Sequence, residues 1–245
     1  MALRNIRALA RRENGFYFNS PIAYIVITVF LLACAVVFFT VETDGETFFS
    51  ANRTEMRRLF TAVPWILAFL VPAISMRLLS EEKRTGTIEL LVTWPVTDRQ
   101  IVFGKYLGGL SFLAIMLAAT LPLVLIVATM GKLDFGLVVG GYLGLFLVGA
   151  AYLGIGLMTS SWTKNQIVAY LVGVLLCAFF YFIDSMLGLV WQDARDAFAF
   201  LSFKAHFDNI ARGVIDLRDL AFYGTVIAVT LVVTSQSLQA RNWKK

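Results

Sequence analysis

The sequence predicts an all-α polytopic membrane protein with six transmembrane helices in a single domain, residues 1–245. Hydrophobic residues make up 59% of the chain, the mean hydropathy is +0.76 and only 15% of residues are charged, whereas soluble domains carry about 25% charged residues. A helix needs about 20 apolar residues to cross a bilayer. Six segments reach or nearly reach that length without Lys, Arg, Asp, Glu or His: Pro21–Thr40, Leu59–Met76, Tyr106–Met130, Phe135–Met158, Gln166–Ile183 and Leu220–Leu238.

The chain before the first span, residues 1–20, is expected to form a cytoplasmic interfacial helix. Between Ala2 and Arg12, apolar residues recur at helical spacing opposite three arginines, a pattern typical of a helix that lies in the membrane interface. A basic flank that only sets the topology is the alternative. The apolar run that follows is longer than the core of a signal peptide and lacks a small-residue cleavage site, so we expect it to remain as the first span.

The distribution of basic residues predicts the orientation. With six spans, both termini lie on the same side as loops 77–105 and 159–165, and this side holds 13 Lys and Arg residues against 8 on the other. Because Lys and Arg are enriched on the cytoplasmic side, we expect both termini in the cytoplasm and residues 184–219 outside. This topology accounts for the net charge of +5, so the basic balance gives no reason to expect a nucleic-acid partner.

The charged segment Ser80–Leu91 separates the second and third apolar runs and is the most distinctive part of the sequence. We expect Ser80 to cap a short helix with Glu81 and Glu82 in its first turn, and Gly86 to interrupt that helix. Thr87 is then placed to cap a second short helix that contains Glu89. A solvated charged loop is the alternative.

The residues after this segment contain a helix-start signal. Pro95 ends the expected second short helix. Thr97 and Gln100 have the spacing of a capping box before an apolar run, which predicts that the next helix begins near Asp98, still in the cytoplasm.

The residue types that metal and hydrolytic sites require are scarce. Cys34 and Cys177 both lie in predicted spans, where small packing residues are the expected interpretation. His206 is the only histidine, and neither a zinc-binding HExxH nor a phosphate-binding GxxxxGK[ST] pattern is present. We therefore expect no metal site, no cofactor and no catalytic residues in this chain.

The segment SEEKRTGTIELLVTWPVTDRQIVFGKYLGGL, Ser80 to Leu110, resembles the signature of ABC-2 type transporter permeases. Four further segments narrow the resemblance to the permease subunit of the gliding-motility-associated ABC transporter group: NSPIAY at 19–24, PAISMR at 72–77, NQIVA at 165–169 and RGVID at 212–216. The likeness extends over nearly the whole chain. Its motifs are weak singly and specific in their order.

The resemblance implies a permease in the bacterial cytoplasmic (inner) membrane, paired with a second copy or a homologue through the first and fifth spans. Two copies of a separate cytoplasmic ABC ATPase would bind ATP and Mg²⁺, and a coupling helix in region 77–105 would contact them. An extracytoplasmic auxiliary subunit is also common in the family. Carried onto this sequence, the expected ATPase-coupling residues are Glu81, Glu82, Arg84, Gly86, Thr87 and Glu89.

The extracytoplasmic segment 184–219 is rich in aromatic residues, which are favoured at membrane interfaces. One interpretation is a pair of amphipathic helices on the outer leaflet. The other is that His206, Arg212 and Asp216 contact the auxiliary subunit while the phenylalanines of the segment anchor it in the interface.

Two other functions and one packing pattern follow from the sequence. A membrane scaffold that transmits force from an ATPase to an external partner is a serious alternative, and a secondary transporter is disfavoured because ion coupling needs ionisable groups in the spans.

Gly136, Gly140 and Gly144 recur every fourth residue, which predicts close packing of the fourth span within the subunit.

The orientation can be tested by cysteine labelling. Single cysteines placed at Thr85 and Ala194, in a chain whose Cys34 and Cys177 are replaced, should be accessible from the cytoplasm and from outside, respectively. Reversed accessibility in sealed membranes would overturn the orientation and the expected contact with a cytoplasmic ATPase.

Overall fold

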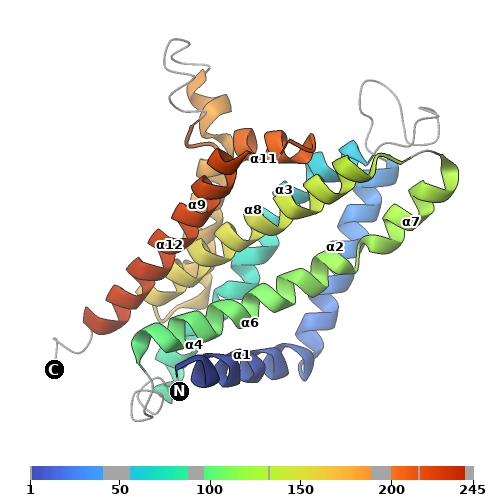
Figure 1. Ribbon diagram of the computed structural model, residues 1–245. Coiled ribbons are helices and arrows are strands. Elements are labelled where there is room, and N and C mark those ends of the chain that lie inside the picture. Colours follow the sequence, from blue (N-terminus) through green and yellow to red (C-terminus); the bar gives the residue numbers. More distant parts are fainter. Residues whose placement is uncertain are drawn as a thin grey trace.

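The computed structural model describes residues 2–40, 56–87, 97–131, 133–188, 200–214 and 216–240, and every regular element within these ranges is a helix. Six helical stretches are long and apolar enough to cross a membrane. The chain is an all-α polytopic membrane protein, which confirms the predicted fold class. In Figure 1, α1, α4 and the last turns of α12 lie at one end of the bundle, and α11 lies at the other.

Helix α1 (Ala2–Phe18) crosses the end of the bundle and is followed at once by the first span, α2 (Pro21–Thr40). The Ser20 hydroxyl accepts a hydrogen bond from the Ile22 backbone N–H at 3.3 Å, and Pro21 suits the first turn because its missing N–H would have no partner there. These local signals explain why the predicted bounds of the first span match the structure.

The second span, α3 (Arg57–Ser75), continues with almost no interruption into α4 (Arg77–Thr85), with only Met76 between them. The third predicted span is instead divided into α6 (Asp98–Ala118) and α7 (Leu121–Met130). At the break, the Thr120 hydroxyl lies 2.7 Å from the Leu117 carbonyl oxygen and 2.8 Å from the Tyr142 hydroxyl. The predicted span is confirmed within the candidate span Asp98–Thr129, and the turn inside it is consistent with Pro122, which cannot continue the backbone hydrogen-bond ladder.

Helix α6 begins as predicted. The Thr97 side chain and the Gln100 backbone N–H form one half of a capping box, and the Gln100 side chain and the Thr97 backbone N–H form the other half. This reciprocal cap is confirmed, and it fixes the start of the helix at Asp98.

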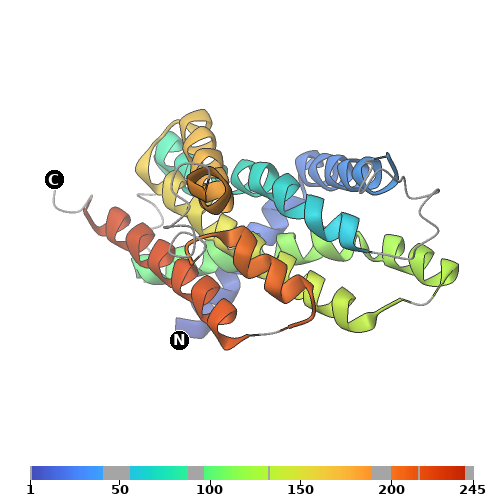
Figure 2. The ribbon, with the colours of Figure 1, turned by 90° about the horizontal axis from the view of Figure 1, so that it is seen from above.

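Helix α8 (Phe135–Trp162) lies inside the bundle and contacts α3, α6, α9 (Gln166–Gly188), α11 (Phe203–Ala211) and α12 (Leu217–Gln239). Seen from above, α11 crosses the bundle, and α2 and α12 lie on opposite sides of it (Figure 2). A Cβ atom added at Gly140 would lie 2.5 Å from the Ile210 carbonyl oxygen, and one at Gly144 would lie 3.0 Å from the Phe207 ring. The glycine stripe therefore packs within the subunit, as predicted.

The apolar face of α11 is buried against the protein. Phe203 and Phe207 are each only 1% exposed, and the Ser202 hydroxyl caps the helix by accepting from the Ala205 N–H at 3.3 Å. The expectation that the phenylalanines anchor this segment in the membrane interface is wrong for these two, because α8, α9 and α12 surround the apolar face of α11. Residues 189–199, the rest of the expected helical pair, lie outside the described ranges.

Candidate functional site

The start of α4 is held by a side chain from α8. The first N–H groups of a helix have no partner within that helix, and here the Ser160 hydroxyl accepts hydrogen bonds from the backbone N–H groups of Leu79 and Ser80 at 3.1 and 3.0 Å. The same hydroxyl donates to the Met76 carbonyl oxygen at 2.8 Å. Ser160 thus joins the α3–α4 junction to the central helix.

The expectation that Ser80 caps α4 was wrong. Helix α4 begins three residues earlier, at Arg77, and Ser80 is fully buried inside it, where its hydroxyl donates to the Met76 carbonyl oxygen. The local sequence favoured a cap at Ser80, because a neighbouring-residue pattern does not show that Ser160, 80 residues away, binds the backbone N–H groups of Leu79 and Ser80 and the Met76 carbonyl.

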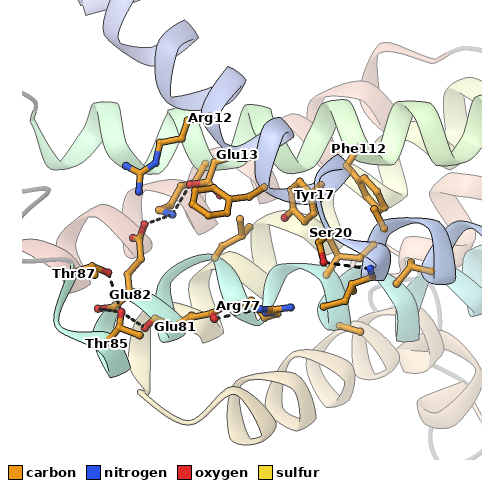
Figure 3. A pocket seen from close by; sticks show the side chains of 18 residues that line it. Arg12, Glu13, Tyr17, Ser20, Arg77, Glu81, Glu82, Thr85, Thr87 and Phe112 are labelled. Atoms are coloured by element: carbon orange, nitrogen blue, oxygen red, sulfur yellow. Dashed lines mark hydrogen bonds and ion pairs between the residues drawn. The ribbon is translucent and has the colours of Figure 1, made fainter.

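The middle of α4 carries one member of a buried ion triad. The Lys105 ammonium on α6 lies 2.8 Å from a carboxylate oxygen of Glu13 on α1 and 2.8 Å from one of Glu82 on α4. The three side chains are only 3%, 10% and 14% exposed, respectively. Figure 3 shows Glu13 and Glu82 approaching one another from helices on opposite sides. The triad therefore links three helices that are far apart in the sequence.

Two glycines allow α1 to approach α6 closely enough to form the triad. A Cβ atom at Gly104 would lie 2.5 Å from the Leu9 Cβ, and one at Gly108 would lie 2.6 Å from the Glu13 Cβ. Next to them, Ser111 donates a 2.7 Å hydrogen bond to the Asn14 side chain. The segment before the first span is helical, as expected, and it packs on α6 through both small and polar residues; its position in the membrane interface stays a prediction.

The last turn of α4 is exposed. Arg77 in the first turn of α4 and Glu81 one turn later form an ion pair at 2.9 Å on the surface of the helix. Arg84 and Thr87 are exposed beyond this pair. Gly86 ends the helix with φ of +74°, and nothing lies within 4 Å of the place where its Cβ would be. The predicted interruption at Gly86 is confirmed.

The predicted coupling residues thus divide into three groups. Glu82 points inward to Lys105, Glu81, Arg84, Gly86 and Thr87 lie at the outer part or end of α4, and Glu89 lies outside the described residues. Sequence reasoning missed Glu13 and Lys105. The only available signal for Lys105 was its position after Gly104, at the boundary of a span.

The opposite end of the bundle contains a second buried polar pair. His206 Nδ1 lies 2.5 Å from a carboxylate oxygen of Asp219, and His206 Nε2 lies 3.0 Å from the Phe200 carbonyl oxygen. His206 is 4% exposed and stacks on Phe222. Its ring therefore faces the protein interior.

The two other residues predicted at this end are exposed. Arg212 lies on the surface just after α11, and Asp216 caps α12, its carboxylate accepting from the Arg218 N–H at 3.0 Å. The three predicted contact residues therefore do not form one surface. Only Arg212 and Asp216 are accessible to a partner.

The site contains no recognisable metal chemistry in the described part of the chain, where no three His, Cys, Asp or Glu side chains gather. Cys34 and Cys177 are free and buried, which agrees with their predicted role as packing residues.

Replacing Lys105 should strongly destabilise the protein. In Lys105→Met, two carboxylates remain buried without their counter-ion, which should lower the free energy of unfolding by about 3–5 kcal/mol. Arg77→Met breaks an exposed pair and should cost about 0–1 kcal/mol. Thermal unfolding of the purified chain measures both. Adding Glu13→Gln and Glu82→Gln to Lys105→Met should recover most of the loss, and failure of this rescue would show that the triad charges are not the cause.

Comparison with known families agrees with this architecture. The sequence profile of the family described as ABC-2 family transporter protein matches residues 22–234. This range includes all of α2 after Pro21, the α4 end, Lys105 and both exposed residues of the opposite end. A search of curated proteins found no match to the chain. Because the family match extends over most of the chain, the protein belongs to the ABC-2 transporter family and is a transmembrane component of an ABC transporter.

Proposed function

We propose that the chain is the permease subunit that couples ATP hydrolysis by a separate cytoplasmic ATPase to export or to conformational work across the bacterial inner membrane. The observation that carries the proposal is the attachment of α4. This short helix ends at an exposed tip, and the Glu82–Lys105 ion pair, together with Ser160, ties it to α6 and α8. A force applied at the tip therefore reaches two other helices.

The mechanism follows from these attachments. Two ATPase subunits bind ATP and Mg²⁺, and one of them contacts Arg84, Thr87 and the residues beyond, including Glu89, with Glu81 at the edge of that surface. When the ATPase dimer closes, it displaces the tip of α4. The displacement passes along the nearly continuous α3–α4 helix into the second span, and through Lys105 into α6 and α1.

Glu82 has a different role from the one expected of a docking residue. Its carboxylate lies against Lys105 and is largely buried, so in this mechanism it is a positioning residue that transmits the movement. The exposed residues of α4 supply the ATPase contact. A second permease copy would meet this one through α2 and α9, as crosslinking between cysteines on these helices in native membranes would test.

Force transmission without substrate transport is the second form of the same mechanism. The resemblance to the gliding-motility group supports it, and the ion triad would serve either form. Substrate flux in reconstituted vesicles that contain the permease and the ATPase separates the two. A secondary transporter has less support, because the buried Lys105 triad lies at one end of the bundle, beside the start of α6, and away from the middle of the spans.

Gly86 provides the sharpest test of coupling. Gly86→Val forces a β-branched residue into a left-handed backbone conformation, which costs about 1–2 kcal/mol or more and should redirect the chain leaving α4. Asn tolerates this conformation, so Gly86→Asn is the matched control. We expect Gly86→Val to insert normally and to lose permease-dependent stimulation of the ATPase, while Gly86→Asn keeps it. Equal stimulation by both variants would contradict the proposed role of the α4 tip.

The opposite end offers a test of an external auxiliary subunit. Because Asp216 also caps α12, Asp216→Ser is preferable to alanine, since serine keeps a capping oxygen and removes the charge. Arg212→Ala combined with Asp216→Ser should reduce copurification of the external partner and leave the ATPase bound. The control is Asp134→Ser, which alters the equivalent cap of α8. Unchanged recovery of the external partner would remove these two residues from the contact.

A further inference from the structure

A cavity of about 420 Å³ lies beside the ion triad, between α1, the first turns of α2, the end of α3, α4 and α6. Figure 3 shows Arg12, Glu13 and Glu82 near one end of it, and Ser20 and Phe112 near the other. Its apolar lining includes Val26, Ala73, Ile74 and Leu78. Cavities of 300–1,000 Å³ that combine an apolar wall with a few polar groups are typical of small-ligand sites.

The position of the cavity points to a ligand from the membrane. Its wall includes Ile22 and Val26, where the first span begins just after α1. Large apolar side chains along α2 are exposed in the single chain, such as Val29 at 49% and Leu32 at 60%, and this surface is available to acyl chains as well as to a second permease copy. Because α2 is long and apolar enough to cross a membrane, a cavity at its first turns is at the level expected for lipid headgroups.

The polar lining of the cavity has as many positive as negative side chains, but not every cation is paired with a carboxylate. Three cations, Arg12, Arg77 and Lys105, accompany three carboxylates. Arg77 is paired with Glu81, and Lys105 is shared between two carboxylates. Arg12 makes no ion pair among the described residues; its guanidinium lies 5.5 Å from the centre of the Phe16 ring. With both carboxylates ionised the triad carries an excess negative charge, and burial raises the pKa of Glu82, so a further cation would offset that charge. Figure 3 shows Arg12 near it.

Two buried polar atoms of this lining have no hydrogen-bond partner in the described part of the chain. They are the second carboxylate oxygen of Glu82 and the hydroxyl oxygen of Tyr17. Burial raises the pKa of the Tyr17 hydroxyl far above its usual range, so it stays protonated and can donate. Buried polar groups are almost always hydrogen-bonded, so both atoms require a partner that the described residues do not supply, and a ligand in the cavity would provide it.

We propose that this cavity binds one phospholipid with a zwitterionic headgroup that carries a primary ammonium, of the phosphatidylethanolamine class. The ammonium pairs with the free oxygen of Glu82, the phosphate accepts from Arg12 and Tyr17, and the acyl chains follow α2 and α3. A bound lipid of this kind would connect the first span to α4. This goes beyond the proposed coupling function and does not depend on it.

The chemistry selects this headgroup over the two common alternatives. A choline headgroup has a quaternary ammonium without N–H groups, so it cannot donate to the Glu82 oxygen. A glycerol headgroup would leave the lipid with a net negative charge beside the negatively charged triad. Only a primary ammonium supplies both the positive charge and the donor that the buried carboxylate oxygen lacks.

Native mass spectrometry of the purified full chain, without any ATPase, tests the proposal. Titration with dioleoyl phosphatidylethanolamine, phosphatidylcholine and phosphatidylglycerol should give a first binding event at least tenfold tighter for the ethanolamine lipid. Ala73→Phe fills the apolar part of the cavity and should abolish this event. Ala128→Phe makes the same change on an exposed face of α7 and should leave it unchanged.

Two conservative variants separate headgroup recognition from loss of folding. Tyr17→Phe removes only the hydroxyl and should weaken binding of all three lipids severalfold, while Glu82→Gln should erase the preference for the ethanolamine lipid over the choline lipid. Equal first-site affinity for the three lipids in the unaltered chain would overturn the proposal. Retention of the tight event in Ala73→Phe would overturn it as well.

Discussion

The buried contact between Lys105, Glu13 and Glu82 is the constraint on which the arrangement of this end of the protein depends. A charge removed from water is tolerated only when it is paired closely, and here one ammonium lies 2.8 Å from each of two carboxylates. The partners come from α1, α4 and α6. None of these helices can move away alone without leaving a buried charge unpaired, so the three move together or exchange partners.

Both ends of the bundle combine a buried polar contact with close packing of small residues. At the α4 end, the triad and the two N–H groups bound by Ser160 accompany the approach of α1 to Gly104 and Gly108. At the α11 end, the His206–Asp219 contact accompanies the packing of Phe207 against Gly144. In a membrane, such small-residue contacts bring backbones together through van der Waals packing. The α4 end therefore ties α1, α4, α6 and α8 together, and the α11 end fixes one helix tightly across α8.

The sequence predicted those features that depend on neighbouring residues. Pro21 and the capping box at Thr97 and Gln100 are local, and both helix starts agree with them. The break after Ala118 was missed because apolar residues continue through it, and hydropathy does not register a lost backbone hydrogen bond at Pro122. The triad was missed for another reason. Lys105 and Glu13 are 92 residues apart, and neither has a local pattern that names the other.

The same difference between local patterns and contacts of distant residues explains which parts of the candidate site the sequence predicted. The sequence located the charged segment and the break at Gly86, but it treated Glu81 and Glu82 as one acidic pair. On a helix, adjacent residues point about 100° apart, so one carboxylate reaches Arg77 on the surface and the other reaches Lys105 inside. Which of the two faces inward depends on where α4 lies against α6. That position is set by tertiary packing, which the segment alone does not encode.

The second span has features that would concentrate bending near the end where it joins α4. Pro72 removes one hydrogen bond from the ladder of α3, which lowers the resistance to bending one turn before α4. At that level α8 and α9 present glycines: a Cβ at Gly156 would lie 3.4 Å from the Pro72 Cα, and one at Gly173 would lie 3.2 Å from the Pro72 Cβ. A displacement of α4 would therefore bend α3 first at Pro72, close to α8 and α9, before it passes along the rest of the second span. Any rotation of α4 there must also carry Glu82, so α6 and α1 follow through Lys105 before the rest of α3 moves.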